Sequence, residues 1–361
     1  MSAVSVRKVV ALIIGIAIVI PAILLMFIGP ASRGTPHELP IGVAGPAPAV
    51  AQVEKALEQR QPGAFDVHRY DDLGALEQAA ADREVYGGLV VGPEPATVIA
   101  TGASPAVAGV LTQLGGQLVR GAPGATSATA APAVIDVAPP AGHDPRGAGF
   151  GSVVMPLFMA GAALGMALTM TLRRVTLVAA VLPVAAAVVA ATCVGAAMAV
   201  GVLPGGFWAQ WFAMFAGILA ISAVIAGLVS LIGMAGMGIA AVVFMLVGMP
   251  LAGIASPPEY LPWVWGHVGQ WLPLGAGGTA LRGAAFFARD SFLGTGTGLA
   301  FVALAMWIVI GYALLGLTVV KRRRLTEKVL TEESSEEEVS AEAAPGDGAS
   351  AGTIPAAVPV S

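Results

Sequence analysis

Long apolar runs recur along the chain and alternate with shorter polar stretches. Each run is close to the roughly 20 residues that an α-helix needs to cross the hydrocarbon core of a bilayer. Such runs lie at Val9–Gly29, Phe150–Thr169, Val178–Leu203, Trp211–Leu231, Gly238–Ile254 and Gly298–Val320. The pattern predicts a polytopic α-helical membrane protein with about six transmembrane helices. The first run has an alternative interpretation as a cleaved signal peptide, although it exceeds the about 7–15 apolar residues usual there.

The segment between the first two runs has a mixed pattern with charges, Pro and Gly, and predicts a folded module. Strands are expected at Leu39–Ala44, Phe65–His68, Gly88–Val91 and Thr97–Ala100, with a possible fifth at Val134–Val137. Apolar residues recur at helical spacing after the first strand, after the second, and after Ser104 and Pro105. The resulting order, βαβαββα, predicts a small sheet covered by helices. We therefore expect an extracytoplasmic α/β domain between transmembrane helices 1 and 2.

Composition supports the membrane assignment. The chain is 57% hydrophobic and 11% charged, whereas soluble domains are about 25% charged. Between Gly147 and Pro258 the only charged residues are Arg173 and Arg174. Cys193 is the single cysteine, so an intrachain disulfide is excluded. The net charge of -4 averages basic membrane flanks with an acidic tail and indicates no nucleic-acid partner.

Basic residues near the ends of the apolar runs predict the orientation. They lie at Arg7 and Lys8, at Arg173 and Arg174, and from Lys321 to Arg324. With six spans all three clusters fall on one side, which the positive-inside rule assigns to the cytoplasm. We therefore expect a multi-pass protein of a bacterial plasma membrane with both termini cytoplasmic. Most Trp and Tyr residues fall at the outer boundaries of this topology, as aromatic belts do.

The predicted organisation has four parts. They are a first transmembrane helix at 1–34, the α/β domain at 35–147, a five-helix membrane domain at 148–324 and a disordered acidic tail at 325–361. Within the membrane domain, 256–290 contains several prolines, three tryptophans and four charged residues, so it is too broken to be a span. We expect short re-entrant or interfacial helices there. A simple interfacial loop is the alternative.

Residues for catalysis or cofactor binding do not form a recognisable set. The four histidines are scattered without metal-ligand spacing, and neither a phosphate-binding loop nor a nucleophile elbow is present. We predict no enzyme activity, no cofactor and no metal site. The predicted spans contain no Asp, Glu, His, Lys or Arg, which disfavours a proton-driven antiporter and a charge-selective channel. Glycine pairs such as Gly161 and Gly165 indicate close helix packing, within one bundle or between two copies.

The layout of one span, an external α/β domain, five further spans and a re-entrant segment before the last one resembles a known family. Two segments of the sequence show the local similarity. They are YDDLGALEQAAADREVYGGLVV at Tyr70–Val91 and PWVWGHVGQWLPLGAGGTALRGAAFF at Pro262–Phe287. The chain is similar over nearly its whole length, except the tail, to permeases of type-2 ATP-binding-cassette (ABC) exporters, in the phage-infection-protein branch. In that family a proline and a later arginine recur before the last span, which would correspond to Pro273 and Arg282.

The resemblance implies a permease subunit that moves an amphipathic or lipid-like substrate outward, driven by a separate cytoplasmic ATPase, as a homodimer. It places the coupling turn, at which the ATPase would act on the permease, at Arg173 and Arg174. The outer gate is expected at Trp263, Trp265, Trp271, Pro273 and Arg282. Two alternatives come from other classes: a membrane-anchored scaffold or receptor whose external domain binds a cell-envelope or protein partner, and an envelope enzyme without a nameable nucleophile.

Overall fold

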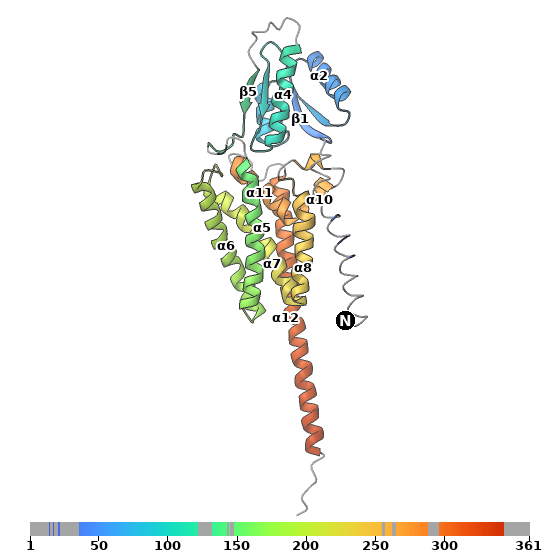
Figure 1. Ribbon diagram of the computed structural model, residues 1–361, viewed down its shortest axis with the longest axis vertical. Helices are drawn as coiled ribbons and strands as arrows, with labels where there is room; N and C mark the ends of the chain where they lie inside the picture. The colour runs from blue at the N-terminus through green and yellow to red at the C-terminus, as the bar shows by residue number, and fades with distance from the viewer. Residues whose placement is uncertain are drawn as a thin grey trace, which may run out of the picture.

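The computed structural model describes residues 36–121, 132–142, 144, 148–254, 257–261, 265–287 and 296–342, and the single positions 14, 17 and 21. An α/β domain lies at one end of a bundle of long helices (Figure 1). Apart from those single positions, the predicted first span, Val9–Gly29, lies outside the described residues. So do Arg7, Lys8 and the tail from 343 onward.

The α/β domain has a five-stranded sheet of order β2-β1-β3-β4-β5. The strands are β1 (Leu39–Ala44), β2 (Phe65–Tyr70), β3 (Gly87–Val90), β4 (Ala96–Ile99) and β5 (Ala133–Asp136). β1 pairs in parallel with β2 and β3, and β4 with β5, while β3 and β4 are antiparallel. The predicted order of elements is confirmed, with strand ends displaced by at most two residues.

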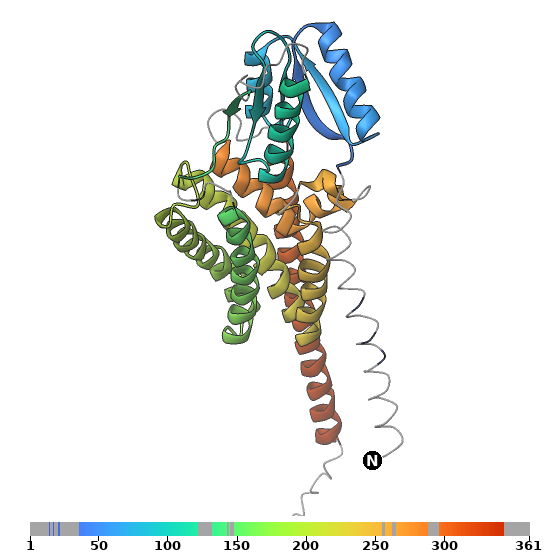
Figure 2. The same ribbon diagram turned by 45° about the horizontal axis from the view of Figure 1, so that its top comes forward.

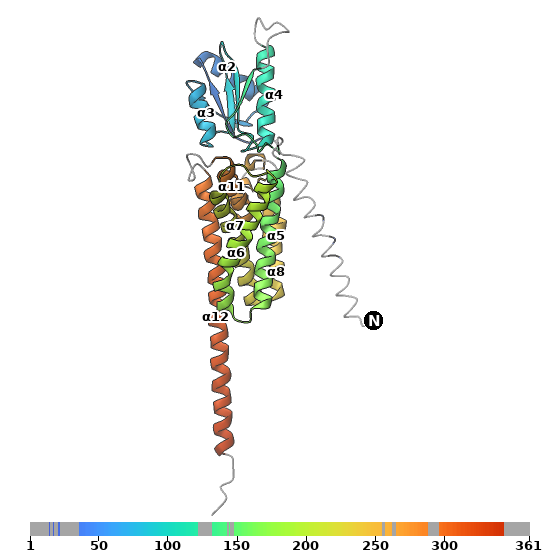
Figure 3. The same cartoon turned by 90° about the vertical axis from the view of Figure 1, so that its left-hand side faces the viewer.

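Helices cover both faces of this sheet (Figure 3). Side chains of α2 (Ala47–Arg60) and α4 (Pro105–Gly121) form one core with β1 and β3, through residues such as Val53, Ile41 and Leu111. On the other face, α3 (Leu73–Ala81) packs Leu76 and Ala80 beside Val98 of β4. Asp72 begins α3 by accepting the backbone N–H of Ala75 at 2.8 Å, as predicted for an N-cap.

Five helical segments among the described residues are long and apolar enough to cross a membrane. They are α5 (Ala148–Thr171), α6 (Val175–Ala199), α7 (Phe207–Ile232), the continuous run of α8 (Met234–Ala241), η1 (Val242–Val247) and α9 (Gly248–Leu251), and the first part of α12 (Thr297–Glu342). These five spans have the length and composition of a polytopic membrane protein, as expected from the apolar runs. Five of the six predicted apolar runs are thus confirmed as helices long enough to span a membrane.

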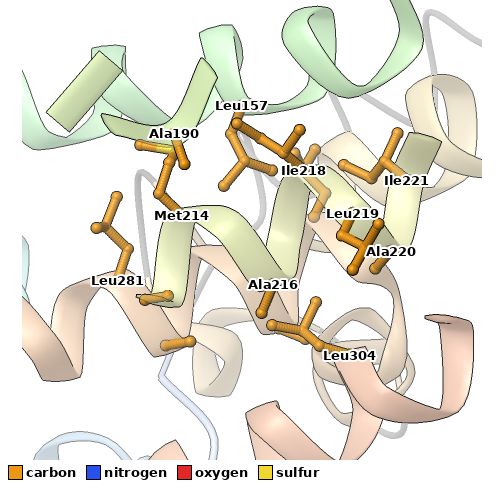
Figure 4. Packing of buried hydrophobic residues seen from close by; sticks show 14 of the residues in the cluster. Leu157, Ala190, Met214, Ala216, Ile218, Leu219, Ala220, Ile221, Leu281 and Leu304 are labelled. Carbon is orange, nitrogen blue, oxygen red and sulfur yellow. The ribbon is translucent and has the colours of Figure 1, made fainter. Parts of the chain in front are cut away.

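α7 is the centre of the bundle. In its most apolar 18-residue window 72% of the residues are buried, against 28% in each of the other four spans. Figure 4 shows Leu157 of α5, Ala190 of α6, Leu281 and Leu304 directed at α7 residues such as Met214 and Ile218. In the other spans many apolar side chains remain exposed, which suits contact with lipid.

The segment before the last span folds into the short helices that its prolines predicted. They are η2 (Pro258–Tyr260), α10 (Trp265–Trp271) and α11 (Pro273–Phe286). Twelve residues of α11 are buried, and several belong to the core around α7. The Trp307 indole N–H donates to the Trp271 carbonyl at 2.7 Å. Because Trp307 lies ten residues into α12, the turn between α10 and α11 is about 15 Å inside the bundle.

This α10–α11 hairpin packs inside the bundle, and close backbone contact holds it in place. A Cβ at Gly269 of α10 would lie 1.7 Å from the carbonyl oxygen of Leu251, so only glycine permits the approach of α10 to α9. Gln270 donates to the Ala252 carbonyl at 3.0 Å and accepts from the Thr279 hydroxyl at 2.5 Å. These bonds satisfy polar groups that would otherwise be unpaired inside the bundle.

The expected disorder from Leu325 onward is wrong as far as Glu342, because α12 continues to that residue. The apolar first part of α12 is already helical, so the unfavourable nucleation step has been completed. Each further residue only has to extend an existing helix. Arg, Glu, Lys and Leu are good helix formers, and Arg323 with Glu327 and Lys328 with Glu332 place opposite charges four residues apart. α12 therefore projects beyond the bundle, on the end away from the α/β domain (Figure 2).

Replacing Gly311 tests the packing of α12 on α7. A Cβ at Gly311 would lie 2.5 Å from the carbonyl carbon of Ala223, whereas a Cβ at Gly316 on the same helix meets no atom within 4 Å. We expect Gly311→Ala to lower the stability of the purified protein by about 1–3 kcal/mol through overpacking. Thermal unfolding in detergent measures it. Gly316→Ala is the matched control, and equal unfolding temperatures for the two variants would contradict the packing.

Candidate functional site

Charged and aromatic side chains gather where the α/β domain meets the bundle. Arg83 follows α3 and Tyr86 precedes β3, both in the α/β domain. Glu259 comes from η2 and Arg282 from α11, both on the membrane side. We call these four residues the junction cluster. It connects two parts of the chain that are about 175 residues apart in sequence, as the hydrogen bond between Tyr86 and Glu259 shows.

The Tyr86 hydroxyl donates to Oε2 of Glu259 at 2.9 Å. Burial, and then the negative charge of Glu259, raise the pKa of Tyr86 far above its ordinary value. The phenol therefore keeps its proton and remains a donor at any physiological pH. A second contact joins the same segments, because the backbone N–H of His37 donates to the Glu259 carbonyl at 2.9 Å. Glu259 is thus held by the α/β domain through both its side chain and its backbone.

Arg83 occupies a backbone position that normally takes glycine. It has φ 63° and follows the C-terminus of α3, where its N–H bonds to the Ala80 carbonyl and that of Glu84 to the Ala79 carbonyl. These two bonds form a Schellman motif, whose left-handed residue is usually Gly. A side chain there costs about 1–2 kcal/mol. An arginine at this position indicates that its side chain has a role that offsets the strain.

The Arg83 side chain reaches the start of the last span. Its Nη1 donates to Oγ1 of Thr297, the first residue of α12, at 3.1 Å, and its guanidinium lies 5.3 Å from the ring centroid of Phe287. Burial lowers the pKa of Arg83, and the negative charge of Glu259 opposes that shift. The group stays protonated at neutral pH because the guanidinium is intrinsically so basic. Arg83 thereby links α3 to α12 and to the end of α11.

Arg282 lies on the membrane side of the junction, in α11, and is 8% exposed. Its Nη2 donates to the Ile254 carbonyl at 3.0 Å, and its guanidinium lies 4.9 Å from the ring centroid of Phe150, at the start of α5. The described residues place no carboxylate within ion-pairing distance of Arg83 or Arg282. Hydrogen bonds and cation–π contacts, rather than ion pairs, therefore hold the two arginines and the Glu259 carboxylate between the two parts of the protein.

Aromatic packing closes the junction around these charges. Phe287 is buried with Ala100, Ala103 and Ala138 of the α/β domain. Phe286 packs against the same cluster and also against Phe150, with ring centroids 5.6 Å apart. The end of α11 is therefore anchored in the α/β domain and in the bundle at once.

The predicted gate residues are not one cluster. Arg282 lies at the junction, whereas Trp271 and Pro273 lie at the deep turn of the α10–α11 hairpin, about one helix length away. Pro273 is buried as the first residue of α11, where a missing N–H is tolerated. Trp265 and Trp271 keep 48% and 41% of their surfaces exposed, and Trp263 lies outside the described residues. Arg83 and Tyr86 were missed, because nothing in their sequence spacing relates them to Glu259.

The opposite end of the bundle carries a basic groove. The predicted coupling residues, Arg173 and Arg174, form the turn between α5 and α6. Arg322 of α12 donates from Nη1 to the Arg173 carbonyl at 3.4 Å, so two of the predicted basic clusters lie together. A groove of about 460 Å³ is lined by Arg173, Arg174, Val175, Thr176, Val319, Arg322, Arg323, Thr326 and Glu327. We call these residues the basic groove.

Among the described residues no set of three or more His, Cys, Asp or Glu side chains lies close enough together to hold a metal ion. Comparison of the chain with protein-family models, with curated proteins and with solved structures found no match.

A double-mutant cycle measures the link between Tyr86 and Glu259. Tyr86→Phe removes the donor and Glu259→Ala the acceptor, and a hydrogen bond to a charged group contributes about 1.5–3 kcal/mol. We expect the double variant to lose less stability than the sum of the two single losses, measured by thermal unfolding in detergent. Tyr70→Phe with Glu259→Ala is the matched control and should be additive. Additivity in both cycles would show that the junction bond contributes nothing to stability.

Proposed function

We propose that this chain is the membrane permease subunit of an ABC-type exporter, which moves an amphipathic or lipid-like substrate outward with a separate ATPase. The observation that carries the proposal is α12. This single helix accepts the Arg83 hydrogen bond at Thr297 and lines the basic groove with Arg322 and Arg323. α12 therefore joins the junction cluster to the basic groove as one continuous helix. In the proposed mechanism, a force on α12 at the basic groove acts on the junction cluster.

The second support is the position of the α10–α11 hairpin. It enters the centre of the bundle beside α7 and is anchored to the α/β domain through Phe286 and Phe287. In the proposed cycle, the ATPase contacts the turn at Arg173 and Arg174 and the adjoining part of α12. A shift of α12 against α5 and α11 then changes the packing of the hairpin and opens a path toward the α/β domain, which receives the substrate.

The composition of the spans supports an external energy source. The described spans, with α12 counted to Val320, contain no Asp, Glu, His, Lys or Arg, which are the residues of proton relays. Their surfaces are apolar, with exposed side chains such as Val184, Val188 and Val309. A substrate with an apolar part suits such a path, because a purely polar solute would be desolvated without compensation.

The proposed topology follows the positive-inside rule. The basic groove lies in the cytoplasm, the α/β domain lies outside, and Val9–Gly29 forms the sixth span, so that both termini are cytoplasmic in a bacterial plasma membrane. Trp208 and Trp265 are at the starts of α7 and α10, at the domain end of the bundle, where an outer aromatic belt is expected. We further propose a homodimer, since type-2 exporters, which this layout resembles, use two sets of spans.

A membrane-anchored scaffold or receptor is the second candidate. The tight packing around α7 favours it, since a helix with 72% of its most apolar 18-residue stretch buried offers a stable anchor and few polar groups for a substrate. In that case the α/β domain alone would carry the function and the spans would only hold it at the membrane.

Co-purification separates the two candidates. The full chain is extracted from native membranes in mild detergent and tested for a bound ATPase subunit and for a change in its rate of ATP hydrolysis. A bound ATPase whose rate depends on the chain supports the permease. If no ATPase is recovered, and deletion of the α/β domain alone abolishes the cellular phenotype, the chain is a scaffold or receptor.

Charge reversal at the turn tests the coupling site. Arg173→Glu with Arg174→Glu should reduce stimulation of the ATPase at least roughly 10-fold, because close charge pairs across an interface contribute about 1.5–7 kcal/mol each. Lys321→Glu with Arg324→Glu is the matched control, since it makes the same charge change outside the residues that line the basic groove. Amount and topology are measured for both. Full stimulation in the first variant would exclude this turn as the coupling site.

A further inference from the structure

We propose that the basic groove binds the phosphate headgroup of an anionic phospholipid from the adjacent leaflet. Its lining comes from two elements, the α5–α6 turn with the start of α6, and the part of α12 that leaves the bundle. The proposal concerns the isolated chain. It is independent of whether an ATPase partner exists.

The groove has an excess of positive charge. It brings together the guanidinium groups of Arg173, Arg174, Arg322 and Arg323, with Glu327 as the one carboxylate in its lining. Among the described residues none of these guanidiniums forms an ion pair. Arginine presents several donors in a plane that matches phosphate oxygens. A phosphate in the groove would reduce the mutual repulsion of the four cations.

The first turn of α6 adds a second attraction for an anion. Val175 and Thr176 line the groove, and no side chain caps the N-terminus of this 25-residue helix. The N-cap position is occupied by Arg174, which supplies a further positive charge instead of a capping oxygen. The unpaired N–H groups and the helix dipole favour a negative group at such an end. The helix end and the arginines therefore select the same kind of ligand.

The level of the groove favours a lipid over a soluble anion. Val175, Val178 and Leu315 belong to the buried cluster directly beside it, and Val319 is part of its lining. Exposed apolar side chains then follow on both helices, Leu177 on α6 and Leu317 on α12, at 47% and 54% exposure. The groove thus lies where the apolar spans end, at headgroup level, and acyl chains can extend along these exposed side chains.

The test uses the purified full chain in zwitterionic detergent, titrated with dioleoyl phosphatidylglycerol, with dioleoyl phosphatidylcholine and with inorganic phosphate. Bound lipid is counted by native mass spectrometry. We expect retention of phosphatidylglycerol and not of phosphatidylcholine, and no displacement by about 10 mM phosphate. Arg322→Gln with Arg323→Gln should weaken retention at least roughly 10-fold, since charge-assisted bonds to phosphate are lost.

The matched control is Lys321→Gln with Arg324→Gln, which removes two charges from the same turns of α12 but not from the groove lining. Its retention of phosphatidylglycerol should stay within about 2-fold of wild type. If Arg322→Gln with Arg323→Gln is unstable in thermal unfolding, Arg174→Gln with Arg323→Gln removes one charge from each element and carries the same expectation. Equal losses in groove and control variants, equal binding of both lipids, or displacement by phosphate would each overturn the proposal.

Discussion

The exclusion of charge from hydrocarbon determines where every polar function of this protein lies. A charged side chain at the centre of a bilayer costs several kcal/mol or more, and the five described spans, with α12 counted to Val320, contain none. The charges of the membrane half therefore collect at its two ends. One end carries the junction cluster beneath the α/β domain, and the other carries the basic groove. α12 is the element that reaches both.

Within the described spans, several polar side chains donate to carbonyls of neighbouring turns or helices, whereas the buried Oγ of Ser230 and Oε1 of Gln210 in α7 have no hydrogen-bond partner. Thr169 and Thr318 donate to the carbonyls four residues earlier, at 2.7 and 2.9 Å. The Trp211 indole and the Tyr312 hydroxyl cross to carbonyls of α6 at 2.9 and 3.0 Å. The last two bonds join α6 to α7 and α12, so they position the helices as well as satisfying donors. The bundle is thereby held by small-residue packing and a few directed bonds.

Much of the fold follows from periodicity alone. The apolar runs predict the five described spans, and Leu39–Ala44 is a strand with the predicted ends, because hydrophobic pattern and turn residues are local properties. The re-entrant helices follow from the density of Pro and Trp in 256–290. The extension of α12 was missed because its composition, taken alone, is that of a disordered tail. A helix nucleated inside the bundle propagates through such a sequence.

Of the two candidate sites, the basic groove could be predicted in part from the sequence and the junction cluster could not. Arg173, Arg174 and the basic run after the last span could be placed at one end by counting spans, and the hydrogen bond from Arg322 brings them together. The junction cluster could not be predicted, since Tyr86 and Glu259 meet only after the sheet and the hairpin have folded. Arg83 has no sequence signal either. Its importance appears only when the backbone places it at the left-handed position of a Schellman motif.

The account depends on the junction and the basic groove lying on opposite sides of a membrane, with the groove in the cytoplasm. Cys193→Ala gives a background without cysteine, into which Gln61→Cys in the α/β domain and Leu330→Cys on exposed α12 are introduced singly. Intact cells are treated with a membrane-impermeant maleimide. The account predicts labelling at position 61 at once and at position 330 only after permeabilisation. Labelling of position 330 in intact cells, with position 61 protected, would contradict it.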